Sequence, residues 1–521
     1  MMIYLCRDLE RRGGGLNLAE LEKALARRHP GAEVRISEDS CRHPEDWLDT
    51  KSGDGRFVLG VCAVNRRGTE FRARLRKLGL DPSAVEVVDI GGLCAHSQGP
   101  GEAAARARLF LEAAVQKLRA HAGSRPENAK MLVAWEEEMS RRSLFTLPPV
   151  RYEVIPSVRD EACVADEGCR ICSSLCPHAA LAPSGGGVMT LSKDRCTGCG
   201  ACVSSCPRGA FDFPGAALPQ VQAEAGALLA GADLANEGRG IMFLCQNAAA
   251  ALREGGGHSC PDGWLPVEIP CLGMVTPSWI LQCLARGAAA VSLLPCPAGD
   301  CKYGEREALE GGVDYCRSLA EEMGLPGETV RLFPPGEPEA LNVSPGKVAL
   351  TNANGAGNHR PAEPDFSPHG AGSAIMELAK RLNPPPELSV THPRSPLGVI
   401  EVLDGCTVCG ACANLCPAGA LTLEKEDDGI SLAFRAAACV GCAGCLDVCP
   451  ENIMELEKRT DLQAIREESR ILYRDTAPRC ENCGGPIAPQ AMLDRIGGIL
   501  KDHPSFSMLT KYCIECRKTM F

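Results

Sequence analysis

Apolar runs alternate with amphipathic segments at both the start and the middle of the chain, and this alternation predicts two α/β regions. In residues 1–122 we expect buried strands and helices in turn. The strands are Phe57–Val61 and Val85–Ile90, and the helices are Leu18–Arg28, Glu70–Leu78 and Gly101–Leu118. In residues 218–340 the strands are Val267–Ile269 and Ala289–Leu294, and the helices are Pro277–Ala285 and Asp314–Met323.

The other segments are of different types. Residues 158–215 and 396–458 have short connections, which predict small compact domains. Residues 123–157 form a polar linker, and residues 341–395 form a loop-rich linker with one short amphipathic helix, Ala374–Leu382. Residues 459–521 form a tail that is expected to start with a charged helix and that contains a later helix-like stretch, Ala488–Leu500. The fold class is therefore multidomain α/β and α+β.

Composition changes this picture mainly through cysteine, because the 521 residues include 31 of them. The number is odd, and most lie two or three residues apart, a spacing that suits metal ligands better than disulfides. The chain begins with no signal-peptide pattern and has no apolar run near the roughly 20 residues of a membrane span. We expect a cytoplasmic, reducing location. The net charge of −11 with no basic block argues against nucleic-acid binding.

The motif CxxCxxCxxxCP occurs twice in residues 396–458, as in bacterial two-cluster ferredoxins. Three cysteines of each run hold one [4Fe–4S] cluster, and the fourth, before proline, holds the other. One ligand set is Cys406, Cys409, Cys412 and Cys449, and the other is Cys416, Cys439, Cys442 and Cys445. Zinc or buried thiols are the alternative, but neither explains the repeated spacing.

Residues 158–215 carry the same pattern with one departure, a five-residue gap between Cys163 and Cys169. The crossing rule predicts two further [4Fe–4S] sets, which are Cys163, Cys169, Cys172 and Cys206, and Cys176, Cys196, Cys199 and Cys202. His178 is expected to be a surface residue. Both segments resemble dicluster ferredoxins over about 60 residues each.

The middle region contains Ile269-Pro-Cys-Leu-Gly-Met-Val and the loop from Cys296 to Tyr303. It resembles the methyl-viologen-reducing hydrogenase delta subunit, also called the hydrogenase iron–sulfur subunit. The resemblance implies a [2Fe–2S] cluster on Cys245, Cys271, Cys296 and Cys301. Family members often have a second cysteine soon after the first, which is missing here, and Cys260 is a possible substitute. Cys283 and Cys316 lie in helical apolar patterns and are expected in the core.

The first region has four sparse cysteines, in Leu5-Cys6, Ser40-Cys41, Val61-Cys62 and Leu93-Cys94-Ala95-His96. Their placement is similar to the amino-terminal domain of the A-type component of heterodisulfide reductase. The resemblance implies a further [4Fe–4S] cluster on Cys6, Cys41, Cys62 and Cys94, with a cluster-free fold as the alternative. That family continues into a flavin domain, but here no GxGxxG turn lies between a strand and a helix, so FAD is not expected.

The tail carries two CxxC pairs, which resemble a zinc ribbon. Four thiolates suit a structural zinc site, on Cys480, Cys483, Cys513 and Cys516. Another iron–sulfur site is the alternative.

These features predict a multi-cluster electron-transfer subunit without catalytic residues of its own. Expected partners in anaerobic metabolism are a flavoprotein, a hydrogenase, a formate dehydrogenase or heterodisulfide-reductase-like subunits. Two alternatives are a redox-sensing scaffold and an oxidoreductase whose own cluster reduces a substrate.

Overall fold

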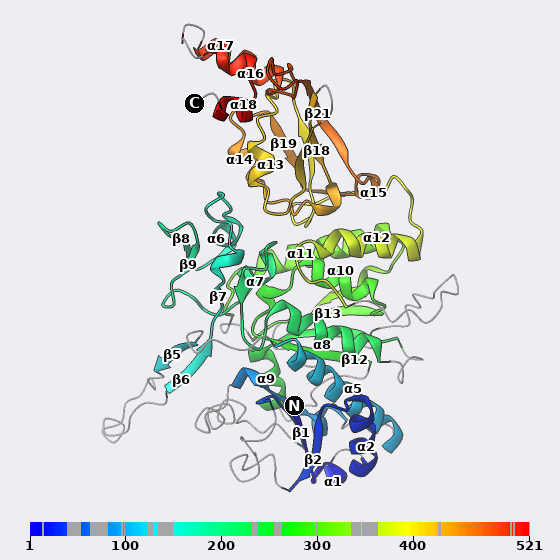
Figure 1. Ribbon diagram of the computed structural model, residues 1–521. Coiled ribbons are helices and arrows are strands. Elements are labelled where there is room, and N and C mark those ends of the chain that lie inside the picture. The colour runs from blue at the N-terminus through cyan, green and yellow to red at the C-terminus, as the bar shows by residue number, and fades with distance from the viewer. Residues whose placement is uncertain are drawn as a thin grey trace.

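A computed structural model provides the structure of the protein (Figure 1). It describes residues 1–12, 15–38, 54–62, 82–94, 97, 99–121, 129–133, 150–231, 238–254, 263–297, 301–334, 345, 363–425, 429–500, 503 and 506–519. The predicted helix Glu70–Leu78 and the cysteines Cys41 and Cys260 lie outside these residues.

The amino-terminal region is a parallel four-stranded sheet in the order β2-β1-β3-β4. Its central strands β1 and β3 are wholly buried, as their continuous apolar sequences require when helices cover a parallel sheet. The strands are β1 (Met2–Cys6), β2 (Glu33–Ser37), β3 (Phe57–Val61) and β4 (Val85–Asp89). The helices are α1 (Leu9–Arg12), α2 (Leu18–Arg28), α4 (Ile90–Leu93) and α5 (Pro100–Arg119).

The middle region is a second parallel sheet, in the order β12-β11-β13-β14. The strands are β11 (Gly240–Cys245), β12 (Trp264–Ile269), β13 (Ala290–Leu294) and β14 (Val330–Leu332). Its helices are α8 (Leu218–Ala230), α9 (Gln246–Glu254), α10 (Pro277–Ala285) and α11 (Arg306–Glu322). Both predicted α/β regions and the described strands and helices predicted within them are confirmed, although α11 begins earlier than the pattern indicated.

The two α/β regions pack together through α5 and α8, which lie side by side between the two sheets (Figure 1). Lys117 of α5 is buried there and bonds the carboxylates of Glu86 and Glu224, at 3.3 and 3.0 Å. Losing either carboxylate would leave a buried ammonium poorly paired, so these charges fix how the regions meet.

The first cysteine-dense segment, here called module 1 (residues 158–215), is built from short antiparallel pairs and two short helices. A further antiparallel pair precedes it. The strands are β5 (Ala129–Val133), β6 (Val150–Val154), β7 (Ser157–Val158), β8 (Leu181–Pro183), β9 (Met189–Leu191) and β10 (Phe211–Asp212). The helices are α6 (Ile171–Leu175) and α7 (Ala201–Ser205).

The second segment, module 2 (residues 396–458), repeats this plan and adds a third strand to one hairpin. The strands here and around it are β15 (Ser389–Thr391), β16 (Val399–Val402), β17 (Leu421–Lys425), β18 (Gly429–Phe434), β19 (Met454–Glu457), β20 (Arg459–Asp461) and β21 (Arg470–Thr476). The helices of the module and the tail are α13 (Ala411–Leu415), α14 (Gly444–Val448), α15 (Leu462–Arg466), α16 (Gln490–Leu500), α17 (Phe506–Lys511) and α18 (Ile514–Thr519).

Part of the predicted linker 341–395 is integral to the fold. Helix α12 (Gly370–Leu382) packs on α10, and the buried Gln282 donates to the Gly370 carbonyl at 2.7 Å. Phe366 stacks on Trp279 with ring centroids 4.6 Å apart. Burial of these rings fixes the segment on the middle region, which the Pro/Gly-rich sequence did not indicate. No helix among the described residues is long and apolar enough to cross a membrane.

Candidate metal centres

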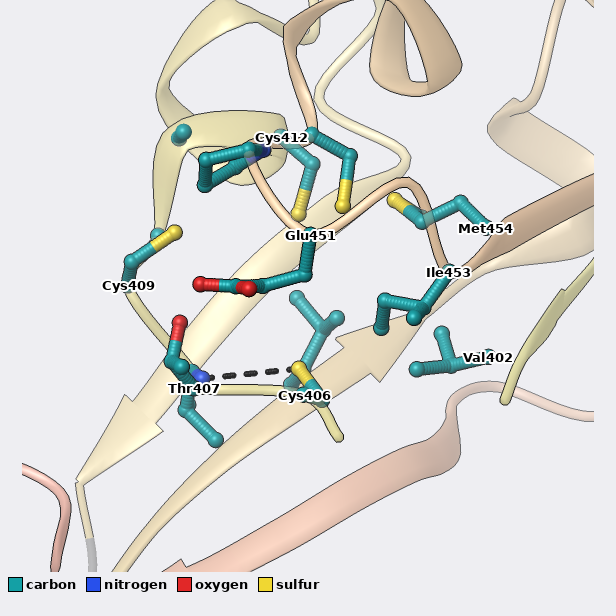
Figure 2. Close-up of a pocket in the computed structure, with 14 residues that line it drawn as sticks. Val402, Cys406, Thr407, Cys409, Cys412, Glu451, Ile453 and Met454 are labelled. Atoms are coloured by element: carbon teal, nitrogen blue, oxygen red, sulfur yellow. Dashed lines mark hydrogen bonds between the residues drawn. The ribbon is translucent and has the colours of Figure 1, made fainter. Parts of the chain in front are cut away.

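The thiols of module 2 gather in two groups. Four of them line one pocket, together with Glu451, whose carboxylate pairs with Arg495 at 3.4 Å. In Figure 2 the sulfur atoms of Cys406, Cys409 and Cys412 face this pocket. The fourth thiol, Cys449, follows α14 and so reaches the pocket from the other half of the module.

In the second group of module 2 the thiols lie close enough to affect one another's pKa. Burial, and then the nearby thiols of Cys439, Cys442 and Cys416, raise the pKa of Cys445 to about 12. Similarly, burial followed by Cys409 and Cys406 raises the pKa of Cys412 to about 11. A bound iron–sulfur cluster would convert these thiols to thiolates, because the positive charge of iron offsets both burial and repulsion.

Two features of the cysteine loops match what a cluster needs. Backbone amides point at the thiols, since Val408 and Gly441 each donate to the cysteine two residues before them at 3.4 Å. The residues after the second cysteines, Gly410 and Ala443, have φ values of 80° and 62°. This left-handed turn starts the short helix that carries the third cysteine, so glycine or a small residue is favoured there.

Module 1 shows the same two groupings. Burial and then the thiols of Cys206, Cys169 and Cys163 raise the pKa of Cys172 to about 12. The pKa of Cys202 is likewise raised by burial and by Cys199, Cys196, Cys172 and Cys176. In both modules, the thiols that lie near one another are therefore those that the crossing rule groups together.

The first loop of module 1 departs from the others in shape as well as in length. Gly168, before Cys169, has a φ of 100°, whereas Arg170 after it is at −131° and not left-handed. Among the described residues, no amide donates to the Cys163 thiol, in contrast to Cys196, to which Gly198 donates at 3.4 Å. With its longer gap, this loop thus lacks the tight turn in which, in the other loops, a backbone amide donates to the first cysteine.

In the middle region four cysteines meet at one edge of the sheet. Cys245 ends β11, Cys271 follows β12 and Cys296 follows β13, and parallel strands end on the same side. The pKa of Cys271 is raised to about 12 by burial and by the thiols of Cys199, Cys301 and Cys245. Cys301 is exposed at this edge. Cys283 and Cys316, predicted to be core residues, are fully buried within α10 and α11.

The same edge holds module 1 through contacts that the sequence did not indicate. The Lys302 carbonyl accepts a hydrogen bond from the Thr197 hydroxyl at 2.8 Å and lies 2.7 Å from His178 Nε2. Lys302 Nζ also pairs with Glu153. His178 is therefore half-buried at an internal contact, where a surface residue was expected. These bonds place the Cys271 and Cys199 thiols within reach of each other's charge.

The amino-terminal cysteines are brought together only in part. The thiols of Cys6 and Cys62 lie 3.9 Å apart, and a carboxylate oxygen of Asp8, which sequence reasoning overlooked, is within 4.8 Å of both. Cys94 is buried, with its thiol 3.4 Å from the Ala103 carbonyl and its pKa raised to about 11 by burial. Cys41 lies outside the described residues.

The tail brings all four of its cysteines together, with their sulfur atoms within 4.8 Å of one another: Cys480, Cys483, Cys513 and Cys516. The amide of Cys513 donates to Cys480 at 3.3 Å and holds the pKa of that thiol below its usual range. Asn482 donates to Cys516 at 3.3 Å. Amide donors and a left-handed Gly484, with φ of 73°, are typical of a knuckle that binds a metal.

Comparison with known families covers the middle region and parts of both modules. Residues 241–344 match the family "Methyl-viologen-reducing hydrogenase, delta subunit". Residues 405–453 match a 4Fe-4S dicluster domain, and residues 189–212 match a 4Fe-4S binding domain. The last match leaves out Cys163–Cys176, the half of module 1 that departs from the usual spacing.

Two curated proteins are similar to the middle region. The D-type iron-sulfur subunit of the F420-non-reducing hydrogenase of Archaeoglobus profundus is 34% identical over 92 residues, which are 17% of this chain and 64% of that protein. The D-type iron-sulfur subunit of the F420-non-reducing hydrogenase vhu of Methanopyrus kandleri is 31% identical over 97 residues, 18% of this chain and 74% of that protein. The match thus spans just under two thirds of the Archaeoglobus protein.

The mixed α/β fold with two 4Fe–4S ferredoxin domains defines an iron–sulfur electron-transfer protein. Through its middle region, the chain belongs to the methyl-viologen-reducing hydrogenase delta-subunit family.

Proposed function

We propose that this chain is a multi-cluster subunit that relays electrons between partner oxidoreductases. Its ferredoxin modules would hold four [4Fe–4S] clusters on the four groups of thiols described above. The middle region would hold a [2Fe–2S] cluster on Cys245, Cys271, Cys296 and Cys301. Such clusters exchange one electron at a time, and the protein sets their spacing, burial and hydrogen bonding.

One observation carries this proposal: the thiol groups follow one another closely enough to form a path. Cys271, in the middle region, lies close enough to Cys199, in module 1, for their charges to interact. Within module 1, Cys202 of one group interacts with Cys172 of the other. Within module 2, Cys445 interacts with Cys412 in the same way. A protein that used one cluster for sensing would need no such series.

Two further sites belong to the proposal. The amino-terminal region, which resembles the first domain of the A-type component of heterodisulfide reductase, would hold a fifth [4Fe–4S] cluster on Cys6, Cys41, Cys62 and Cys94. The close pair Cys6 and Cys62 supports this site. The tail would hold zinc on its four cysteines, as a structural site.

The partners would be redox proteins that meet the chain at exposed thiol groups. The edge with Cys301 is a suitable entry, because this thiol is exposed and its domain is similar to hydrogenase subunits. A hydrogenase, a formate dehydrogenase, a flavoprotein or a heterodisulfide-reductase-like subunit in an anaerobic cytoplasm would fit that edge.

The test is the metal content of anaerobically purified protein, read beside an EPR titration with a reductant. Full loading predicts about 22 iron atoms and about one zinc per chain. About 16 iron atoms without a [2Fe–2S] signal would restrict the path to the two ferredoxin modules. A markedly lower iron content that resists reconstitution with iron and sulfide would refute the relay.

A further inference from the structure

The lengthened loop of module 1 contacts module 2. A Cβ atom on Gly168 would lie 2.7 Å from Leu415 Cδ1, so the glycine leaves just enough room for that side chain. The other methyl of Leu415 would be 3.1 Å from a Cβ on Gly444. Leu415 is half-buried in this position. Its side chain therefore lies between the backbones of two modules that are far apart in the sequence.

Each residue at this contact neighbours a cysteine of a proposed cluster. Gly168 precedes Cys169, Leu415 precedes Cys416, and Gly444 lies between Cys442 and Cys445. The contact thus joins one thiol group of module 1 to one thiol group of module 2. A Cβ on Gly444 would also lie 3.8 Å from the Cys442 sulfur, so Leu415 packs beside Cys442 on one side and beside the residue that precedes Cys169 on the other.

Other contacts hold module 2 from a different side. Tyr315 of α11 and Thr460 of β20 are joined by a hydrogen bond of 2.6 Å between their hydroxyl groups. A Cβ on Gly372 of α12 would lie 2.5 Å from the Ala437 carbonyl oxygen, which shows how closely α12 packs on module 2. The start of α12 also meets module 1, because His369 Nε2 lies 3.1 Å from the Pro207 carbonyl. Module 2 is therefore anchored independently of Leu415.

We propose that the lengthened loop 163–169 is a docking element for module 2, with Gly168 and Leu415 as positioning residues that bring Cys169 and Cys442 together for electron transfer between the modules. The inference rests on the proposed relay. One electron crosses at this point, so that the cluster which gives it up is oxidised and the cluster which receives it is reduced. No bond forms or breaks and no proton moves, and the electron comes from the one-electron donor that loads the chain.

The first test measures hydrogen exchange of the amides in residues 164–168 in the full, cluster-loaded chain. Leu415→Ala should speed their exchange by about threefold or more, because the loop loses the side chain that packs on it. The matched control is Leu175→Ala, since Leu175 precedes a Cys-Pro in the same way but is 46% exposed. The control should leave the exchange of residues 164–168 unchanged.

A second pair of variants changes the module 1 side of the contact, in case Leu415→Ala disturbs cluster binding at Cys416. Gly168→Ala should speed exchange in residues 411–415, because the new methyl collides with Leu415. Gly209→Ala is its control, since Gly209 also has a positive φ, 57°, yet nothing lies closer to its Cβ position than 3.8 Å. Gly209→Ala should leave exchange in residues 411–415 as it is in the unmodified chain.

The second readout is the magnetic interaction between clusters in the dithionite-reduced protein, followed by EPR. We expect broadening from the contact to weaken in Leu415→Ala and Gly168→Ala while both controls keep it. Unchanged exchange and unchanged broadening in these two variants, at full iron content, would overturn the docking role. That result would leave the relay intact, whereas a low iron content in the unmodified chain would count against the relay itself.

Discussion

The two ferredoxin modules share one plan but differ in what surrounds them. Module 1 contacts both the middle region and module 2, through Lys302 at one end and Leu415 at the other. Module 2 meets module 1 at one end, while its other thiol group opens into a pocket lined by Glu451. Its hairpin is extended by β21, a strand of the tail. Module 2, in which both cysteine runs keep the standard spacing, therefore lies at the end of the series of thiol groups.

This difference shows how a repeated motif is adapted to its place in a larger protein. In module 1 the departure from the motif, at residues 163–169, is the part that faces module 2. In module 2, where the corresponding pocket faces no other module among the described residues, Cys406–Cys412 keeps the standard spacing. An altered loop can thus serve the contact between domains, provided that its cysteines still reach the same position.

The largest effect should come from removing the first cysteine of each module. Both Cys163→Ala and Cys406→Ala should lower the iron content by about four atoms per chain, because each would lose one of the four ligands of a cluster. Iron and acid-labile sulfide analysis measures this. Cys283→Ala is the control, since this fully buried thiol lies in α10, outside the proposed groups, and should keep all the iron. Full iron in Cys163→Ala would show that the altered loop uses another ligand.

A smaller effect, on stability, is expected when the glycine that follows the second cysteine of a run is replaced, and its size should differ between the modules. A Cβ on Gly200 would lie 2.7 Å from Met274 Sδ and 3.0 Å from Phe213, both buried. A Cβ on Gly410 would meet only the end of Leu423 closely, at 2.6 Å, and that side chain is 36% exposed. Gly200→Ala should therefore cost about 3 kcal/mol of stability and Gly410→Ala about 1 kcal/mol, nearly all of it backbone strain.

Anaerobic thermal unfolding of both glycine variants checks this order. The module 2 position has an internal reference, because the equivalent residue of its second loop is already alanine, Ala443. Equal losses in the two variants would mean that packing against the middle region adds nothing to module 1.

The smallest effect concerns the tail, which touches the chain through module 2. Within the tail, Asp475 of β21 accepts from the Ala491 amide at 2.7 Å, and Arg495, whose side chain is exposed, pairs with the half-buried Glu451 of module 2. Such contacts contribute about 1 kcal/mol each or less. A zinc chelator should remove about one zinc per chain and speed amide exchange in residues 480–516, with the iron content unchanged. Loss of iron instead of zinc would identify the tail as another iron–sulfur site.

The sequence by itself determined the spacing of the cysteine motifs, the two α/β regions and the absence of a GxGxxG turn placed for a flavin. These are local properties: a cluster loop needs fixed spacing over about ten residues, and a buried parallel strand needs a short apolar run. That is why the thiols predicted to cross between the halves of each module are the ones that the structure brings together.

Only the tertiary structure decided how these parts meet. The bonds of His178 and Thr197 to Lys302, the burial of α12 and the contact of Gly168 with Leu415 join residues more than 80 positions apart. Asp8 beside Cys6 and Cys62 is a further example. No periodicity or spacing encodes such contacts, because they depend on complementary surfaces formed after each domain has folded. The order of the thiol groups along the proposed path is therefore a property of packing.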